Sequence, residues 1–184
     1  DPIITAGQLV QALQTIVSRN IKAIEPAVVS VTQIHGGDAY NVIPERVALA
    51  GTVRCFSDAT RELIKDKISV ICKGVAEANS CQFQLNYTER FPPTVNSDSE
   101  TETAAKVAKK ICGVDNVDTN TEMVTGSEDF GYMLQEKPGC YAFIGNGLEH
   151  GGCLLHNPRY DFNDDIIPIG ASYWVNLVHE LLTP

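Results

Sequence analysis

The sequence predicts a mixed α/β and α+β fold in two parts, and three features of the residue pattern support this. The first half orders its elements as helix, strand, strand, helix, strand, which is a ferredoxin-like β-α-β-β-α-β unit lacking its first strand. The second half alternates helices with short apolar strands, which is typical of layered α/β structure. Residues 91–97 combine two prolines with a polar cluster, so domains are expected at residues 1–93 and 94–184.

The first helix is expected over about residues 2–19. Asp1 is a suitable N-cap and Pro2 a suitable first helical residue. Apolar side chains then recur at helical spacing, at Val10, Leu13 and Val17. A chain that opens on a helix cap without an initial Met is expected to be the C-terminal part of a longer protein.

Three strands and a second helix complete the first half. Residues 27–34 and 45–56 have strand composition, and the second of these alternates, with Val53 on the apolar face and Arg54 on the opposite one. A helix capped by Asp58 is expected next. Its apolar stripe comprises Ile64, Ile68, Ile71 and Val75. A third strand is expected over residues 81–89, where Phe83, Leu85 and Tyr87 alternate.

In the second half, a helix is expected over about residues 99–112 and a short strand near residues 116–119. An apolar strand follows over residues 139–147. The last helix has Asp164 or Asp165 as its expected cap. One face of that helix carries Ala171, Trp174, Val178 and Leu181.

Composition narrows the classes of function. The 184 residues carry a formal net charge of −9, which repels phosphates and argues against nucleic acid as a partner. No apolar run has the length of a membrane span and no signal peptide is visible, so the expected location is cytoplasmic, away from membranes. The six cysteines form no C-x-x-C pair and are read as reduced and mostly buried.

The segment HGGDAYNVIP, residues 35–44, is long for a hairpin connection. Within it, Asn41 either braces the loop by bonding its own backbone or presents an amide donor to a ligand, and local sequence favours bracing. Arg54 is either a solvated strand arginine or a clamp for a carboxylate. Because both residues flank one strand, a ligand at the start of that strand is a candidate to meet both.

Glu128 lies in TGSEDFGYM, where a helix start with Ser127 as N-cap explains the acidic residues completely. His156 lies in GGCLLHNPRYDF, between leucines and an Asn-Pro turn. It is either a structural histidine or a ligand placed in a loop after a buried strand, with nearby aspartates available to orient the imidazole. No paired His or Cys motif accompanies it, and His150 is its only near histidine.

Taken together, six stretches of this chain resemble one family. These are DPIITAGQLVQALQTIVSRN, GGDAYNVIPERVALAGTVRCF, FPPTVN, GSEDFGYM, PGCYAFIGNG and LHNPRYDFND. They are similar to the C-terminal half of the metal-dependent aminoacylase and carboxypeptidase superfamily, in its branch of hippurate and indole-acetyl-amino-acid amidohydrolases. The resemblance implies that residues 1–93 form most of a lid and dimerisation domain. It also implies that residues 94–184 close a catalytic α/β domain.

The resemblance also implies roles for four residues. His156 corresponds to a metal ligand, Asn41 to a catalytic group that reaches into a substrate site, often the partner subunit's, and Arg54 to the residue that holds the substrate carboxylate. Glu128 falls in a segment near the substrate. The implied reaction hydrolyses N-acyl amino acids with two divalent ions, zinc, manganese or cobalt, in a homodimer that pairs through the lid.

The family's remaining metal ligands and its general-base glutamate have no counterpart after Asp1. The resemblance therefore implies that this chain alone is inactive and does not fully bind the metals. The alternative is a free-standing ferredoxin-like binding or dimerisation module without catalysis.

Overall fold

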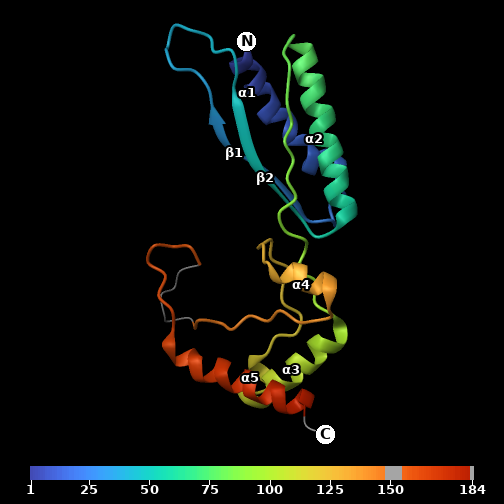
Figure 1. Cartoon of the computed structure of the whole chain (residues 1–184), viewed down its shortest axis with the longest axis vertical. Coiled ribbons are helices and arrows are strands. Elements are labelled where there is room, and N and C mark those ends of the chain that lie inside the picture. The colour runs from blue at the N-terminus through green and yellow to red at the C-terminus, as the bar shows by residue number, and fades with distance from the viewer. Residues whose placement is uncertain (148–154, 183–184) are drawn as a thin grey trace. The chain divides into compact units, whose positions relative to one another are not determined.

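The computed structural model describes residues 1–147 and 155–182. The chain divides into two compact units, Asp1–Pro93 and Thr94–Pro184, and the division falls directly after the two consecutive prolines. Figure 1 shows the elements of each unit along the colour gradient. Each unit is described by itself below.

The first unit is an antiparallel β-hairpin with helices on it. Helix α1, Pro2–Leu13, is followed by a π-helical turn at Ile16–Asn20, strands β1, Ala27–His35, and β2, Ala48–Cys55, and helix α2, Asp58–Ala78. As predicted, Asp1 caps α1, and its carboxylate accepts a hydrogen bond from the backbone N–H of Ile3 at 2.9 Å. The predicted strands and second helix are confirmed, although β2 begins at Ala48.

The cap of α2 was wrongly predicted. Ser57, and not Asp58, is the N-cap residue, and its hydroxyl oxygen accepts a hydrogen bond from the backbone N–H of Thr60 at 3.2 Å. Asp58 is instead the first helical residue, where its charge suits the positive end of the helix dipole and pairs with Arg61 at 2.7 Å.

Apolar residues of both helices and the hairpin form the core of this unit. The buried members are Leu13, Ile16, Ile64, Ile68 and Cys72. Val29, Val31, Val53 and Cys55 cover them from the strands. Side chains alternate across a strand, so the opposite face of β2 carries Arg54, which is exposed as the sequence predicts.

The third predicted strand, residues 81–89, is wrong as a strand. This segment joins no ladder, and the sheet of the described first unit has the two strands β1 and β2. In a split β-α-β-β-α-β unit the last strand pairs with the first, and the described residues of this unit contain no strand besides β1 and β2. Residues 81–89 therefore lie along the unit without a strand partner in the described residues (Figure 1).

Residues 81–89 are held in place by side-chain contacts rather than by strand pairing. Tyr87 packs against the core, and the ammonium group of Lys65 in α2 lies 5.5 Å from the centre of its ring. Lys65 also donates a hydrogen bond to the carboxylate of Glu89 at 3.2 Å. Of the three alternating residues, Tyr87 packs against the core, whereas Phe83 and Leu85 are exposed.

The second unit contains helices α3, Asp98–Cys112, α4, Phe130–Glu136, and α5, Ile167–Leu182, with 3-10 turns at Val114–Asn116 and Asp164–Ile166. Helices α3 and α5 pack together and are tied by Lys106 and Glu180, 2.5 Å apart. The predicted strands near 116–119 and over 139–147 do not form, because no ladder involves these described residues. In its described residues, the second unit thus consists of helices joined by extended segments.

The last helix departs from its prediction in two ways. Asn163, and not Asp164 or Asp165, caps the 3-10 turn that leads into α5. The predicted apolar face, with Trp174, Val178 and Leu181, is exposed in the structure. Among the described residues, no helix has the length and apolar character that a membrane span requires.

Gly51 marks a close approach between the two strands. It pairs with Val31, beside an irregularity of the register between Val31 and Gln33. A Cβ at Gly51 would overlap the backbone carbonyl oxygen of Ser30 on the opposite strand. This position therefore requires glycine for space rather than for an unusual φ angle.

Gly51→Ala is expected to lower the free energy of unfolding by about 1–3 kcal/mol, because the strands must separate to admit the methyl group. Gly74 in α2 has open space around it and is the matched control, since Gly74→Ala should stabilise the helix by about 0.5–1 kcal/mol. Urea denaturation of both variants measures the difference. A Gly51→Ala variant as stable as Gly74→Ala would contradict the close approach.

Candidate functional site

The four predicted site residues fall in two groups, one in each unit. Asn41 and Arg54 belong to the first unit, and Glu128 and His156 to the second. Each residue is described below together with the loop, strand or turn that contains it.

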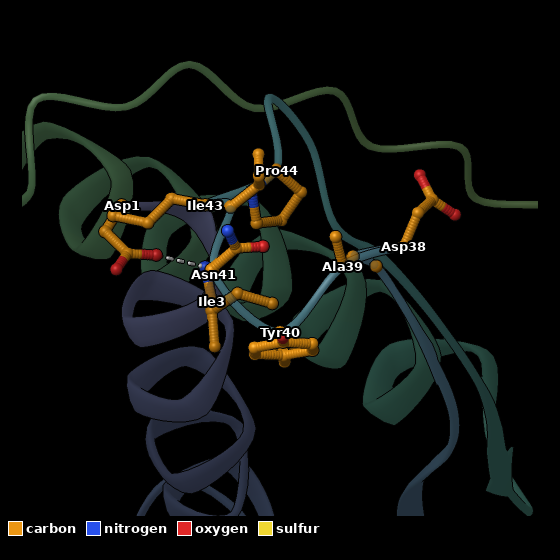
Figure 2. Close-up of a pocket in the computed structure, with 11 residues that line it drawn as sticks. Asp1, Ile3, Asp38, Ala39, Tyr40, Asn41, Ile43 and Pro44 are labelled. Atoms are coloured by element: carbon orange, nitrogen blue, oxygen red, sulfur yellow. Dashed lines mark hydrogen bonds between the residues drawn. The ribbon is translucent and has the colours of Figure 1, made fainter.

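Asn41 lies in the loop between β1 and β2, which borders a cavity of about 700 Å³. The cavity is lined by Asp1 and Ile3 of the α1 start and by residues 36–44. Figure 2 shows the amide of Asn41 among Asp1, Ile43 and Pro44, whereas the carboxylate of Asp38 points away from it. The loop thus presents an exposed amide beside the N-terminus of a helix.

Two features of this loop fix its path. Gly37 has φ +84°, a conformation that favours glycine, and the backbone N–H of Val42 donates to the carbonyl oxygen of Ala39 at 3.3 Å. This second bond closes a turn around Asn41. The predicted bracing of the loop by the side chain of Asn41 finds no support among the hydrogen bonds of the described residues, since the turn is closed by backbone groups.

Arg54 lies far from that loop within the unit. It pairs with Val28 near the other end of the hairpin, six residues beyond Ala48. A strand rises about 3.4 Å per residue, which separates Arg54 from the loop end of β2 by about 20 Å. The expectation that one small ligand could meet Asn41 and Arg54 of the same copy is therefore wrong.

Glu128 precedes α4 and contacts Tyr141. The predicted helix start with Ser127 as N-cap is wrong, because α4 begins at Phe130 with Asp129 at the cap position and no side-chain cap bond. Glu128 is instead half-buried, and its carboxylate accepts a hydrogen bond from the Tyr141 hydroxyl. Burial raises the pKa of Tyr141, and the Glu128 charge and hydrogen bond raise it further.

Tyr141 itself is fixed from several sides, and sequence reasoning missed it. Its backbone N–H donates to the Asn96 side-chain oxygen at 2.8 Å, and the Asn96 side-chain nitrogen donates to its carbonyl oxygen at 2.9 Å. Its ring lies 5.4 Å from the ring of Phe130 and 5.3 Å from that of Phe143. Since Asn96 lies 45 residues away, no local pattern could have indicated this arrangement.

His156 sits in a turn with an unusual backbone. Its φ is +70°, which non-glycine residues seldom adopt, and its side chain is exposed. The turn continues at Asn157, whose side-chain oxygen accepts from the N–H of Arg159 at 2.9 Å and whose carbonyl oxygen accepts from the N–H of Tyr160 at 2.9 Å. This arrangement holds an imidazole outward and is unlike a packed core histidine.

The described residues do not bring together a full set of metal ligands. In residues 1–147 and 155–182, no three His, Cys, Asp or Glu side chains are grouped to hold an ion. Within the same residues, no ion pair joins His156 to Asp161, Asp164 or Asp165, the aspartates expected to orient it. His150 lies outside the described residues. The exposed imidazole of His156 fits one ligand position, and a two-metal centre needs further donors.

Comparison with known proteins gives a consistent set of relatives. The model of peptidase family M20/M25/M40 matches residues 6–180. Hippurate hydrolase of Campylobacter jejuni is 38% identical over 99% of this chain and 47% of its own length. IAA-amino acid hydrolase ILR1-like 4 of Arabidopsis thaliana is 31% identical, over 99% of this chain and 42% of its own. N-acetyldiaminopimelate deacetylase of Priestia megaterium is 35% identical over 94% of this chain and 44% of its own length.

Solved structures that are similar to this chain include a protein of the same family. A dinuclear metal-binding peptidase of the M20 family from Bacillus subtilis superposes with a TM-score of 0.80 and 26% identity, over 99% of this chain and 46% of that one. The crystal structure of an aminohydrolase from methicillin-resistant Staphylococcus aureus gives a TM-score of 0.79 and 30% sequence identity. The match covers 100% of this chain and 47% of that one. The chain thus spans a little under half the length of the proteins that it matches.

Glu128→Gln is expected to lower the pKa of Tyr141 toward the ordinary tyrosine value, because the substitution removes a negative charge that opposes ionisation of the phenol. The measurement is a pH titration of the Tyr141 ring carbon signal by NMR. Glu122→Gln, a change of equal charge in the same stretch, is the control and should leave the titration unchanged. An unaltered Tyr141 pKa in Glu128→Gln would show that burial alone raises it.

Proposed function

The chain belongs to peptidase family M20/M25/M40, and on that basis we propose that the natural protein containing it hydrolyses the amide bond of N-acyl amino acids. The products are a carboxylic acid and a free amino acid. The observation that carries this proposal is the match of hippurate hydrolase and N-acetyldiaminopimelate deacetylase to 94–99% of the chain, since both names denote cleavage of an acyl group from nitrogen. The runner-up, a ferredoxin-like module without catalysis, explains neither match.

We assign the two units different tasks. The first unit, Asp1–Pro93, is proposed as a lid and dimerisation domain of ferredoxin-like type, and the second, Thr94–Pro184, as the closing part of a catalytic domain. Support for pairing through the first unit comes from β1, which pairs with β2 along one edge in the described residues and leaves its other edge to a partner strand. The proposed assembly is a homodimer.

We propose His156 as one ligand of a divalent metal centre. The exposed imidazole in its outward turn supports this role, as does the dinuclear metal binding of the similar peptidase from Bacillus subtilis. Zinc, manganese and cobalt are the proposed ions, and when bound they would supply Lewis acidity to the amide carbonyl and to water. The further ligands of such a centre are proposed to come from outside this chain, since no three candidate ligands are grouped in its described residues.

Asn41 and Arg54 are proposed to act on substrate from the lid. The Asn41 amide is exposed at the end of a closed turn and can donate to the oxygen on which charge develops as the amide is attacked. Arg54 presents a guanidinium from the solvent face of β2 and can hold the free carboxylate of an N-acyl amino acid. Their separation of about 20 Å within one copy supports the idea that Asn41 serves the partner subunit's substrate.

Glu128 is proposed as a substrate-side residue of the second unit. Its carboxylate is already engaged by the Tyr141 hydroxyl, which leaves it oriented rather than mobile. A carboxylate in this state can still accept a second hydrogen bond from a substrate N–H. Its partner Tyr141 is fixed by Asn96, so the position of Glu128 depends on residues far apart in the sequence.

The natural protein that contains this chain can be tested directly with a panel of N-acyl amino acids, assayed with added manganese, zinc or cobalt. Release of free amino acid that requires one of these ions supports the proposal. A protein that cleaves none of the panel with any ion, while folding normally, contradicts it and favours the binding-module alternative.

Asn41→Ala is expected to lower kcat by about 10²-fold with little change in KM, because an oxyanion donor acts mainly in the transition state. Asn86→Ala, which removes another exposed amide of the same unit, is the matched control and should leave kcat unchanged. Steady-state kinetics on one N-acyl amino acid measures both. A change confined to the melting temperature of Asn41→Ala would instead indicate a loop-bracing residue.

Arg54→Ala is expected to raise KM by about tenfold or more for substrates with a free carboxylate, and to leave the KM of their methyl esters unchanged. The reason is that the ester offers no negative charge to the guanidinium. Arg46→Ala is the control, since Arg46 is an exposed arginine just before the same strand. Equal effects of Arg54→Ala on acids and esters would argue against the clamp.

A further inference from the structure

Two asparagine side chains join the ends of the segment that carries His156. The Asn146 side-chain nitrogen donates to the carbonyl oxygen of Asp161 at 2.8 Å, and its side-chain oxygen accepts from the backbone N–H of Asn163 at 2.8 Å. The Asn163 side-chain nitrogen returns a hydrogen bond to the carbonyl oxygen of Asn146 at 3.2 Å. We call these three bonds the asparagine clamp.

The clamp is anchored to the last helix. The Asn163 side-chain oxygen accepts from the backbone N–H of Asp165 at 3.1 Å and so caps the 3-10 turn that leads into α5. Both polar atoms of the Asn163 side chain are therefore engaged, one with the helix start and one with the clamp. Helix α5 in turn packs on α3, which gives the clamp a rigid base.

Closing the ends of this segment restricts where His156 can lie. His156 comes ten residues after Asn146 and seven before Asn163, so an open connection of this length would let the imidazole sample many positions. The clamp fixes the two ends, and the turn at Asn157 fixes the chain next to the histidine. The φ of +70° at His156 is a strained conformation that such surroundings can hold.

We propose that Asn146 and Asn163 are positioning residues, which hold the base of the His156 segment so that the imidazole is in place to bind a divalent metal ion. This inference rests on the proposed function of His156 as a ligand. The clamp residues do not touch the ion, and they act by limiting the positions of the ligand. Loss of such supporting contacts typically costs about 10–100-fold in metal affinity.

The alternative is that the clamp merely supports the start of α5, and one variant separates the two roles. Asn163→Ser keeps a side-chain oxygen that can cap the 3-10 turn and removes the nitrogen that donates to Asn146. Asn146→Ala removes the two clamp bonds that the Asn146 side chain makes, and it keeps both the bond to its backbone carbonyl oxygen and the cap. Asn176→Ala is the matched control, because the Asn176 side chain donates within α5, to the carbonyl oxygen of Ser172.

The experiment uses the natural protein that contains this chain, stripped of metal and titrated with manganese by calorimetry. Asn146→Ala, Asn163→Ser and His156→Ala should each weaken manganese binding about tenfold or more, whereas Asn176→Ala should not. Amide hydrogen exchange of residues 155–160 in the metal-free protein should rise in the two clamp variants, with melting temperatures equal to that of the control.

Three outcomes of this experiment would contradict the positioning role of the two asparagines. Loss of affinity in His156→Ala with unchanged affinity in both clamp variants overturns the inference and leaves the proposed ligand role standing. Unchanged affinity in His156→Ala overturns the ligand role, and the inference falls with it. A clamp variant that loses affinity only in proportion to a lowered melting temperature, with unchanged exchange at residues 155–160, identifies the clamp as support for α5 alone.

Discussion

The first unit depends on the burial of two helices against one face of a two-stranded sheet. A hairpin of two strands is marginally stable in water by itself, so β1 and β2 persist because Ile16, Ile64 and Ile68 cover their apolar face. This one-sided burial decides where chemistry can be placed. Side chains on the opposite face, such as Arg54, are exposed, and the loop that carries Asn41 lies at the end of the hairpin, where its path is set by backbone turns.

Local signals predicted the helices well and the strands only in part. Helix caps and apolar periodicity are contained within a few residues, so α1, α2 and α3 follow from the sequence. A strand also needs a neighbour that offers backbone groups, and alternation cannot show whether that neighbour exists. Residues 81–89 and 139–147 therefore have strand-like patterns without ladders, and each segment contains a tyrosine, Tyr87 or Tyr141, that is held by side-chain contacts.

Some features of the candidate site follow from local sequence, and others depend on residues that are far apart in the chain. The exposure of Arg54 follows from alternation along β2, and Gly37 in the Asn41 loop has the positive φ that its sequence allows. The separation of Asn41 from Arg54 follows from the length of the predicted strand over residues 45–56, because Arg54 lies near the end of that strand away from the loop. The hydrogen bond between Glu128 and Tyr141 joins residues thirteen positions apart in separate segments, and no spacing rule identifies such a pair.

In the second unit, asparagine side chains do much of what a ladder does in the first. Asn96 pairs with both backbone groups of Tyr141, and Asn146 pairs with Asn163 and Asp161. A ladder spreads its hydrogen bonds over many residues, so one substitution removes a small share of them, whereas these connections depend on the side chains of one or two asparagines. Asn96 acts on the partner of Glu128, and the asparagine clamp acts on the segment of His156. The positions of both candidate residues in this unit are therefore controlled by amides that touch neither of them.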